Sequence, residues 1–370
     1  MSGALRMRKG LDDVPAYKQG RPASVLEGEE SFKISSNENP YPPLPAVVDA
    51  VAATLTGMNR YPEFAATALT ARVAARFDVA PENIVFGAGS VEVVSQLIRA
   101  TSAPGNEVVF AWRSFEAYPM LVRTAGAVPV EVPLNADHGH DLDAMLTAVT
   151  ERTSLIMVCN PNNPTGTTVG AEELTAFLDA VPAHVTVLLD EAYVHFNRRP
   201  DTAVGIAAFR AHPNVVVAHT FSKAYGLAGM RVGYAIAPAL LVAAMRKMAI
   251  PFGVTTPAQI AALASLEAED ELQVRVDALI GERERIVAAL SAQGWQLPET
   301  ETNFLWFPLG DDTTAALEVF EAHGLSVRGF AGEGLRATIA ETQANNRLLD
   351  TAAELVSRGL TGGCTVAAAS

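Results

Sequence analysis

Residues 220–231 bring an amine, two hydroxyl groups and a guanidinium group into one short stretch of chain. Thr220 and Ser222 precede Lys223, and Arg231 follows it. A lysine amine can hold an aldehyde as a Schiff base, while hydroxyl groups and a fixed positive charge bind phosphate. The segment therefore predicts a site for an aldehyde that carries a phosphate, and pyridoxal 5′-phosphate is the cofactor with that chemistry.

Asp190 follows an apolar run, and its carboxylate is suited to the ring of such a cofactor. A carboxylate beside a pyridine nitrogen keeps that nitrogen protonated, so the ring can accept the electrons of a carbanion. Tyr193 and Asn163 are suited to bind the ring hydroxyl. Each residue also has a structural alternative, since an aspartate can cap a helix, a tyrosine can pack in a core, and Asn-Pro-Asn-Asn-Pro-Thr-Gly around Asn163 is typical of turns. Without Lys223, helix capping would be the favoured interpretation of Asp190.

Two further motifs predict anion binding. Gly87-Ala88-Gly89-Ser90 joins a predicted strand to a predicted helix, and backbone amides at a helix N-terminus bind phosphate. Taken alone, this motif is equally well interpreted as a plain tight turn. Arg336 lies in the predicted strand 335–339 beside apolar neighbours, where a half-buried arginine needs an anion. That anion is either a substrate carboxylate or the partner in a structural salt bridge.

The composition limits the size class and the partners of the chain. With 370 residues, 49% of them hydrophobic and 18% charged, it predicts a globular protein of two domains. A formal net charge of −14 argues against binding to nucleic acid or to an anionic membrane. Cys159 and Cys364 are too few and too far apart for a disulfide framework or a zinc site, and the histidines show no metal-ligand spacing. We therefore expect no bound metal. The N-terminus lacks the apolar core of a signal peptide, so we expect a cytoplasmic protein.

From residue 46 to about residue 260, short apolar runs alternate with helical patterns, which is typical of an α/β domain with a mostly parallel sheet. The predicted strands are 83–86, 107–111, 128–132, 154–159, 185–190, 215–219 and 232–236, and helices are predicted between them at 91–100, 171–180 and 240–248. Residues 266–290 carry dense charge at helical spacing and predict one long connector helix.

Beyond the connector, the pattern predicts a smaller α+β domain, with strands at 303–307, 325–328 and 335–339 and helices at 313–323 and 341–358. The proline-rich first 45 residues predict an extended arm without regular elements. We therefore predict an arm at 1–45 that belongs to the small domain, a large cofactor-binding domain at 46–262, a small domain at 263–360 and a disordered tail at 361–370.

Together these motifs resemble the fold type I aminotransferases, and within them the histidinol-phosphate aminotransferase family. The likeness runs from about Lys33 to Arg358 and rests on motifs that match in order and spacing: Ser36-Asn37-Glu38-Asn39-Pro40, Arg60-Tyr61-Pro62, the Asn-Pro-Asn-Asn-Pro-Thr-Gly run, Asp190-Glu191-Ala192-Tyr193 and the lysine segment. The resemblance implies a large domain with a mostly parallel sheet in α/β/α layers, a smaller α+β domain, and an enzyme that uses pyridoxal 5′-phosphate.

The resemblance also implies roles for the site residues. Lys223 would hold the cofactor and act as general acid and base, Asp190 would face the ring nitrogen, and Tyr193 and Asn163 would face the ring hydroxyl. Phe115 matches the aromatic residue that stacks on the ring. The other cofactor-binding residues would be Gly89, Ser90, Val91 through its backbone, Thr220, Ser222 and Arg231. Substrate would be bound by Asn39, Arg336 and Arg328. Tyr61 matches a residue that reaches the phosphate of the neighbouring subunit, which implies a homodimer with shared active sites.

A narrower likeness concerns the substrates. Residues 111–119 and Gly89-Ser90-Val91-Glu92 resemble the actinobacterial aromatic amino acid (phenylalanine) aminotransferase branch. That branch implies reversible amino transfer from phenylalanine, tyrosine and tryptophan to 2-oxoglutarate. The alternatives are a histidinol-phosphate aminotransferase, a threonine-phosphate decarboxylase and a cofactor-binding transcription regulator. The regulator would need a DNA-binding module, for which the chain offers neither a basic patch nor room.

Overall fold

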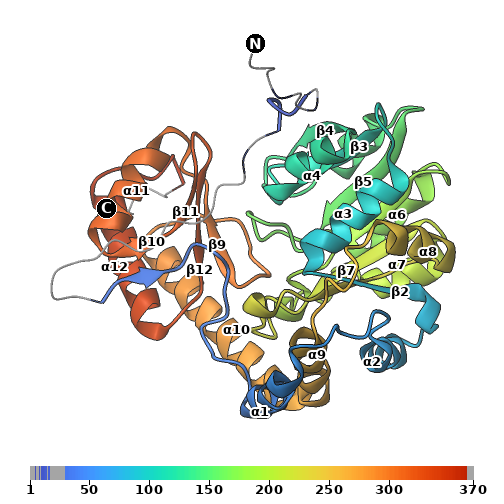
Figure 1. The fold of residues 1–370 in the computed structure, drawn as a ribbon. Helices are drawn as coiled ribbons and strands as arrows, with labels where there is room; N and C mark the ends of the chain where they lie inside the picture. The colour runs from blue at the N-terminus through green and yellow to red at the C-terminus, as the bar shows by residue number, and fades with distance from the viewer. Residues whose placement is uncertain (1–4, 6–7, 9, 15, 17–29, 365–370) are drawn as a thin grey trace.

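The structure is a computed structural model that describes residues 5, 8, 10–14, 16 and 30–364. These residues form two lobes that lie side by side, with helix α10 (Glu269–Ala292) between them (Figure 1). We call the lobe with the seven-stranded sheet the large lobe and the lobe with the three-stranded sheet the small lobe.

Seven strands form the sheet of the large lobe: β2 (Ile84–Gly87), β3 (Glu107–Trp112), β4 (Val128–Pro133), β5 (Thr153–Cys159), β6 (Thr186–Asp190), β7 (Val215–Thr220) and β8 (Gly233–Ile236). Their order is β2-β8-β7-β6-β5-β3-β4. Strand β8 is antiparallel to both of its neighbours, and the other pairs are parallel. The predicted mostly parallel sheet is confirmed, and all of its predicted strands are present with small shifts at their ends.

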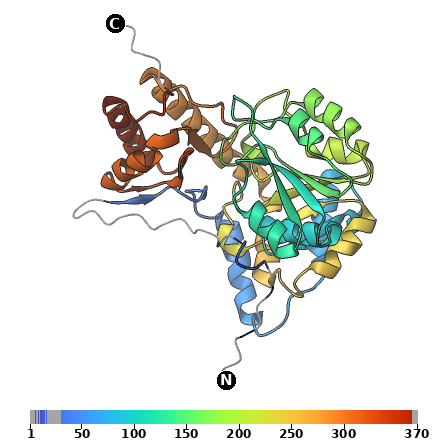
Figure 2. The same cartoon turned by 90° about the horizontal axis from the view of Figure 1, so that it is seen from above.

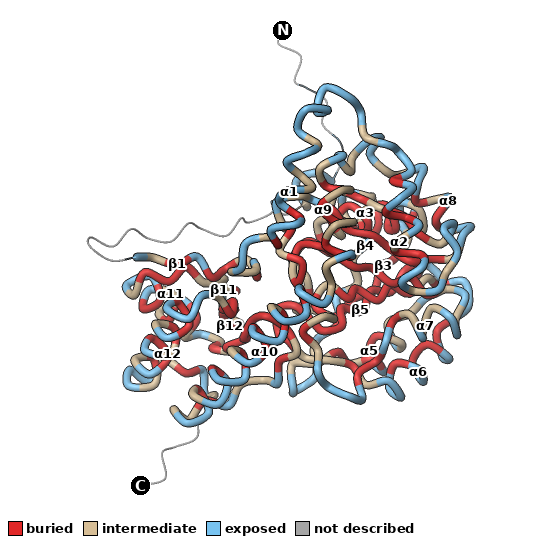
Figure 3. The backbone as a smooth tube through the Cα atoms, turned by 90° about the horizontal axis from the view of Figure 1, so that it is seen from below, coloured by how far each residue is buried: buried red, intermediate tan, exposed pale blue. Residues whose placement is uncertain are grey.

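Helices cover both faces of this sheet: α2 (Thr67–Phe77), α3 (Ser90–Thr101), α4 (Ala117–Ala125), α5 (Leu142–Thr147), α6 (Ala171–Ala180), α7 (Gly205–Ala211) and α8 (Ala239–Met248). Alternate residues of a strand point to opposite faces, so Leu155 and Met157 of β5 pack with α3, α4 and α8, whereas Ile156 and Val158 pack with the helices opposite. Because both faces are covered, the central strands are buried along nearly their whole length (Figure 3). Figure 2 shows the same lobe from above, with the strands between the helices.

The small lobe contains β9 (Phe304–Phe307), β10 (Leu325–Ser326), β11 (Arg328–Phe330), β12 (Gly334–Thr338), α11 (Thr313–Ala322) and α12 (Thr342–Ser357). Its sheet is antiparallel with the order β11-β12-β9. Strand β1 (Phe32–Lys33) pairs with β10, so a segment near the start of the chain packs on a lobe formed near its end.

We call residues 34–39, which follow β1, the strap. Ile34 N donates to Ser326 O at 2.9 Å, and Thr338 N donates to Ile34 O at the same distance. Asn37 N donates to Thr338 Oγ1 at 2.9 Å. The strap is therefore hydrogen-bonded to the small lobe before the chain enters α1 (Pro45–Thr54) and the large lobe.

The structure corrects several predicted elements. The connector helix predicted at 266–290 is present as α10, but it begins later than predicted, because residues 266 and 267 are the last two residues of α9 (Thr256–Glu267). The first turn of α10 holds Glu269, Asp270 and Glu271, and carboxylates stabilise a helix N-terminus, which explains the separate start. The strand predicted at 325–328 is divided between β10 and β11, which belong to different sheets.

The arm at 1–45 was predicted to lack regular elements, but β1 lies within it and α1 begins at Pro45, because proline suits the first helical position. The domain boundary predicted after residue 262 falls inside α9, and the domain limits as a whole stay a prediction.

The predicted disordered tail begins too early. Gly362 N donates to Asp312 Oδ2 at 2.9 Å, and Gln296 N donates to Cys364 O at 2.8 Å, so residues 361–364 pack on the small lobe. The rest of the predicted tail, 365–370, lies outside the described residues. Within the described part of the chain, no helix is both long enough and apolar enough to cross a membrane. The cytoplasmic location stays a prediction.

Candidate active site

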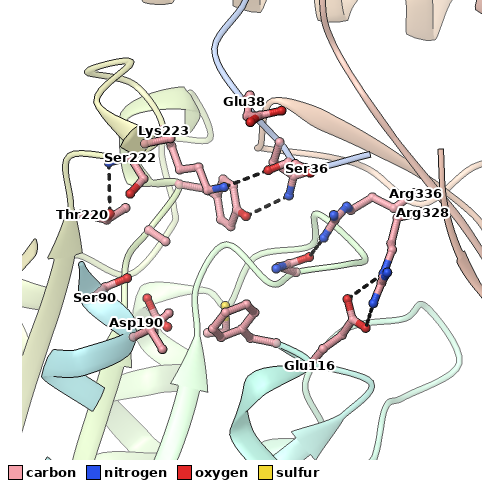
Figure 4. Close-up of a pocket in the computed structure, with 18 of the residues that line it drawn as sticks. Ser36, Glu38, Ser90, Glu116, Asp190, Thr220, Ser222, Lys223, Arg328 and Arg336 are labelled. Atoms are coloured by element: carbon pink, nitrogen blue, oxygen red, sulfur yellow. Dashed lines mark hydrogen bonds and ion pairs between the residues drawn. The ribbon is translucent and has the colours of Figure 1, made fainter. Parts of the chain in front are cut away.

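A cavity of about 450 Å³ lies where the two lobes meet (Figure 4). It is lined by strand ends of the large lobe, by the strap and by the small-lobe sheet. Most of the predicted site residues line it: Ser90, Val91, Phe115, Asn163, Asp190, Tyr193, Thr220, Ser222, Lys223, Arg231, Arg328 and Arg336. Gly89, Asn39 and Tyr61 are not among the lining residues.

The topology of the sheet explains why these distant residues meet. Asp190 is the last residue of β6, and Thr220 is the last residue of its parallel neighbour β7. Asn163 lies in the turn that follows β5, the other parallel neighbour of β6. In an open α/β sheet, ligands bind outside the carboxyl ends of the strands, and these three residues all lie there.

Lys223 lies in the turn after β7, and its Nζ donates to Ser36 O of the strap at 3.1 Å. The Tyr193 ring centroid lies 5.8 Å from the same atom. Burial, and after it the positive charge of Arg336, lower the pKa of Lys223 to about 7. Near neutral pH much of this amine is therefore unprotonated, which is the form that attacks a carbonyl carbon.

The Asp190 carboxylate is buried and has one strong partner. Its Oδ2 accepts a hydrogen bond from Tyr118 Oη at 2.8 Å. Its Oδ1 is also buried and has no hydrogen-bond partner of ordinary geometry among the described residues. Burial raises the pKa of Asp190, and the Tyr118 hydroxyl and the Ala192 backbone amide oppose that rise. Asp190 lines the cavity, and a carboxylate with one oxygen lacking such a partner fits the ring nitrogen of pyridoxal phosphate.

Tyr118 is a functional residue that our sequence reasoning missed. It is fully buried near the start of α4, and its ring meets the Phe115 ring edge-on with the centroids 5.5 Å apart. The sequence holds one signal, since Phe115 and Tyr118 are three residues apart at a predicted strand end. That spacing is common in any helix, so it could not identify the hydrogen bond to Asp190.

Tyr193 and Asn163 both line the cavity but have different partners. Tyr193 Oη accepts a hydrogen bond from Asn37 Nδ2 of the strap at 2.8 Å. Asn163 Oδ1 accepts from Arg336 Nη1. Burial raises the pKa of Tyr193, so its hydroxyl keeps its proton at neutral pH and can donate it in a hydrogen bond.

The glycine-rich turn and Arg231 form a cradle suited to phosphate. Gly89 adopts φ +83° as the N-cap of α3, and a Cβ there would collide with Arg231 Nη2. Arg231 itself adopts φ 54°, a left-handed conformation that non-glycine residues rarely take. Its Nη1 donates to Ala228 O at 2.8 Å. The N-terminus of α3 and the guanidinium group therefore meet at one place, where an anion is stabilised.

The sides of this cradle are fixed by further hydrogen bonds. Thr220 Oγ1 accepts from Ser222 N at 3.0 Å, which holds the turn before Lys223. Glu92 Oε2 accepts from Ala88 N and so holds the glycine-rich turn. Ser90 and Ser222 line the cavity beside Arg231, and together these groups fit the phosphate of pyridoxal phosphate.

Arg328 and Arg336 reach the cavity from the small lobe. They occupy directly opposite positions in the antiparallel pair β11–β12, so both side chains project from the same face of the sheet. Arg336 Nη2 donates to Ser35 O at 2.7 Å, whereas Arg328 forms an ion pair with Glu116. Sequence reasoning missed Glu116, because no local pattern pairs residues so distant in the chain.

The other predicted residues have different surroundings. Asn39 Nδ2 donates to Ala224 O at 2.9 Å and to Lys223 O at 3.4 Å, so it holds the backbone of the lysine turn from outside the cavity. Tyr61 is 81% exposed and stacks on Phe252, with ring centroids 4.8 Å apart. In the described part of the chain, no cluster of histidine, cysteine and acidic side chains could hold a metal ion.

Comparison with known proteins relates this cavity to a family. Residues 29–351 match the family model described as aminotransferase class I and II. An aromatic amino acid aminotransferase of Streptomyces avermitilis is 53% identical over 344 residues, which cover 93% of this chain and 96% of that protein. Its counterpart from Thermobifida fusca is 51% identical over 346 residues, which cover 94% of this chain and 96% of that protein.

Solved structures have the same fold. The histidinol-phosphate aminotransferase from Sinorhizobium meliloti, determined in complex with pyridoxal-5′-phosphate, has a TM-score of 0.86 and 26% identity, covering 97% of this chain and all of that one. An aspartate aminotransferase mutant from Thermus thermophilus has a TM-score of 0.76 and 25% identity, covering 88% of this chain and 95% of that one. The predicted fold type I architecture is confirmed. With a family model that matches most of its length and relatives about half identical nearly from end to end, this chain belongs to the class I and II aminotransferase family.

Proposed function

We propose that the protein is a pyridoxal 5′-phosphate-dependent aminotransferase that transfers the amino group of phenylalanine, tyrosine or tryptophan to 2-oxoglutarate. The observation that carries the proposal is the meeting in one cavity of the Lys223 amine, whose pKa is lowered, and the Asp190 carboxylate, whose Oδ1 is orphaned. The aromatic substrate class is supported by the names of the relatives that are about half identical to this chain.

Pyridoxal phosphate, when bound, supplies an aldehyde that combines with amines and a ring that accepts electrons. Lys223 Nζ would be the amine that holds this aldehyde. When free, Lys223 Nζ would act as the general base that removes the proton from the substrate Cα and as the general acid that gives a proton back. Asp190 would face the ring nitrogen and keep it protonated. In this way the two residues remove a proton and stabilise the charge that it leaves behind.

The remaining residues bind and orient. Ser90, Ser222 and Arg231, which line the cavity, would hold the phosphate, and Phe115 would stack on the ring. Tyr193 and Asn163 would donate hydrogen bonds to the ring hydroxyl. Arg336 binds the substrate carboxylate, because its guanidinium group enters the cavity beside Asn163. The keto acid leaves before 2-oxoglutarate enters, so the kinetics are ping-pong.

We also propose that the active protein is a homodimer whose sites are shared. Tyr61, Phe64 and Phe252 expose 81%, 58% and 42% of their surface, and the Phe252 ring contacts both of the others. Nearby Ile250 is 58% exposed. Contiguous exposed aromatic groups of this kind mark a protein–protein interface. Tyr61 on this patch would contact the phosphate of the partner subunit.

A second candidate function is amino transfer from histidinol phosphate. It is supported by the solved histidinol-phosphate aminotransferase that shares this fold and by the second arginine, Arg328, in the cavity.

The donor can be identified with a panel of amino donors. With 2-oxoglutarate as acceptor, we expect kcat/KM for phenylalanine to exceed that for histidinol phosphate by at least about tenfold, or ~1.4 kcal/mol. Lys223→Ala should abolish turnover with every donor, and borohydride reduction of the wild-type protein should label the peptide containing Lys223. A preference for histidinol phosphate would favour the second candidate, and full activity of Lys223→Ala would refute both.

The hydrogen bond to Asp190 can be tested with Tyr118→Phe. The change removes a donor to a buried carboxylate, which costs about 1–3 kcal/mol and raises the pKa of Asp190. The ring nitrogen is then less fully protonated, so we expect kcat to fall about 10- to 100-fold while KM changes little. Tyr234→Phe is the matched control, because Tyr234 is a buried tyrosine of β8 that does not contact Asp190. Equal loss in both variants would contradict this role.

The lowered pKa of Lys223 predicts how cofactor attachment depends on pH. Only the unprotonated amine attacks the aldehyde, so the attachment rate to cofactor-depleted protein should rise with pH and level off above about pH 7. An ordinary lysine, with a pKa of about 10.4, would still gain rate up to pH 10. Arg336→Gln removes a neighbouring positive charge and should move the midpoint to higher pH. Stopped-flow absorbance gives the rates, and a midpoint near pH 10 in the wild type would disprove the prediction.

The dimer can be tested by a charge placed in the aromatic patch. Wild-type protein should sediment at about twice 39.1 kDa at micromolar concentration. Ile250→Asp should weaken association about tenfold or more, because it places a charge in an apolar contact. Leu240→Asp, at an 87% exposed position of α8, is the control and should leave the dimer intact. A monomeric wild-type protein with full activity would refute the shared site.

A further inference from the structure

Arg328 and Arg336 stand side by side at the substrate end of the cavity (Figure 4). Like charges at opposite positions of an antiparallel pair repel each other. Arg336 donates hydrogen bonds to Asn163 Oδ1 and Ser35 O, and Arg328 forms an ion pair with a carboxylate that lines the same cavity.

That carboxylate is Glu116, which lies directly after Phe115 and just before α4. Arg328 Nε donates to Glu116 Oε2 at 3.0 Å, and Arg328 Nη2 donates to Glu116 Oε1. The side chains are 12% and 24% exposed, so the pair is largely shielded from water. Two parallel bonds between a guanidinium and a carboxylate form the strongest arrangement of this kind. Glu116 also lines the cavity, so the pair belongs to the cavity wall.

We infer that Glu116 competes with the anionic side chains of substrates for Arg328 and is thereby a specificity-determining residue. The inference rests on the proposed function and deepens it. A substrate with an anionic side chain, such as glutamate or 2-oxoglutarate, must displace Glu116 before it can bind Arg328. A substrate with an aromatic side chain makes no demand on Arg328 and leaves the ion pair in place. Glu116 therefore sets how strongly the site favours uncharged side chains over anionic ones.

A purely structural role makes a different prediction. The pair crosses from the large lobe to the small lobe, and it also offsets the repulsion between Arg328 and Arg336. In that case its loss would weaken the closed arrangement of the lobes for all substrates alike. The two roles can be distinguished by the ratio of kcat/KM for glutamate to kcat/KM for phenylalanine. A general weakening of the contact between the lobes would lower both constants and leave their ratio unchanged.

The chain offers a matched control for the structural role. Arg113 and Glu333 form a second ion pair between the same two lobes, with the charges exchanged. Neither residue is among those that line the cavity. Removing that pair therefore costs an inter-lobe contact but leaves Arg328 occupied.

The experiment compares Glu116→Gln, Glu333→Gln and wild type, all loaded with pyridoxal phosphate. The half-reaction with each amino donor alone is followed by cofactor absorbance, which gives kcat/KM without an acceptor. In Glu116→Gln we expect kcat/KM for glutamate to rise about tenfold and that for phenylalanine to change less than about threefold. In Glu333→Gln we expect the ratio of the two constants to stay as in wild type. In Glu116→Gln/Arg328→Gln the gain for glutamate should disappear.

Ligand binding gives a second readout that does not depend on turnover. Glutarate and 3-phenylpropanoate resemble the two substrate types but lack the amino group. Calorimetry should show about tenfold tighter binding of glutarate to Glu116→Gln than to wild type, with little change for 3-phenylpropanoate.

The inference would be overturned if Glu116→Gln changed both constants equally, or if Glu333→Gln shifted the ratio as much. If the wild-type protein reacts with phenylalanine but Glu116→Gln leaves the ratio of kcat/KM for glutamate and phenylalanine unchanged, only the role of Glu116 is refuted. A wild-type protein that reacts with no aromatic donor refutes the proposed function itself.

Discussion

The active site depends on two ionisable groups, Asp190 and Lys223, whose pKa values are shifted in opposite directions inside one shielded cavity. Burial disfavours the charged form of both, because it raises the pKa of Asp190 and lowers that of Lys223. The Tyr118 hydroxyl opposes the effect on Asp190, whereas the Arg336 charge adds to the effect on Lys223. The hydrogen bond from Tyr118 thus limits the rise in the pKa of Asp190, whereas the two largest effects on Lys223 both lower its pKa. In the proposed mechanism, Asp190 would stabilise charge on the ring and Lys223 would move a proton.

The sheet supplies the geometry for this arrangement. Parallel strands buried on both faces can be apolar along their length, and their polar chemistry is collected just beyond their carboxyl ends. Asp190, Thr220 and the turn with Asn163 all follow that rule. The small lobe then closes the cavity with an antiparallel ladder, in which register alone sets Arg328 beside Arg336.

The sequence was most informative where chemistry and local pattern coincide. Lys223 with its flanking hydroxyl groups and Arg231, and Asp190 at a strand end, could be predicted because short segments position them. The long connector helix could be predicted from its charge pattern, but its start escaped prediction, because charged residues at helical spacing continue through the break between α9 and α10. Tyr118 and Glu116 also escaped, because each acts through a contact with a residue far away in the chain. Such contacts depend on how the lobes and layers pack, and they produce no periodic pattern in the sequence.

The strap connects the cofactor site mechanically to the rest of the molecule. Its Ser36 carbonyl accepts a hydrogen bond from Lys223 Nζ, and its Asn37 backbone amide donates to Thr338 Oγ1 of the small lobe. The Asn37 side chain donates to Tyr193 Oη. A few consecutive residues therefore hold the Lys223 amine, the Tyr193 hydroxyl and β12 at once. Any hinge movement of the small lobe pulls on this segment and must stretch or exchange hydrogen bonds beside Lys223. Opening of the cleft between the lobes and movement of the Lys223 side chain are therefore coupled.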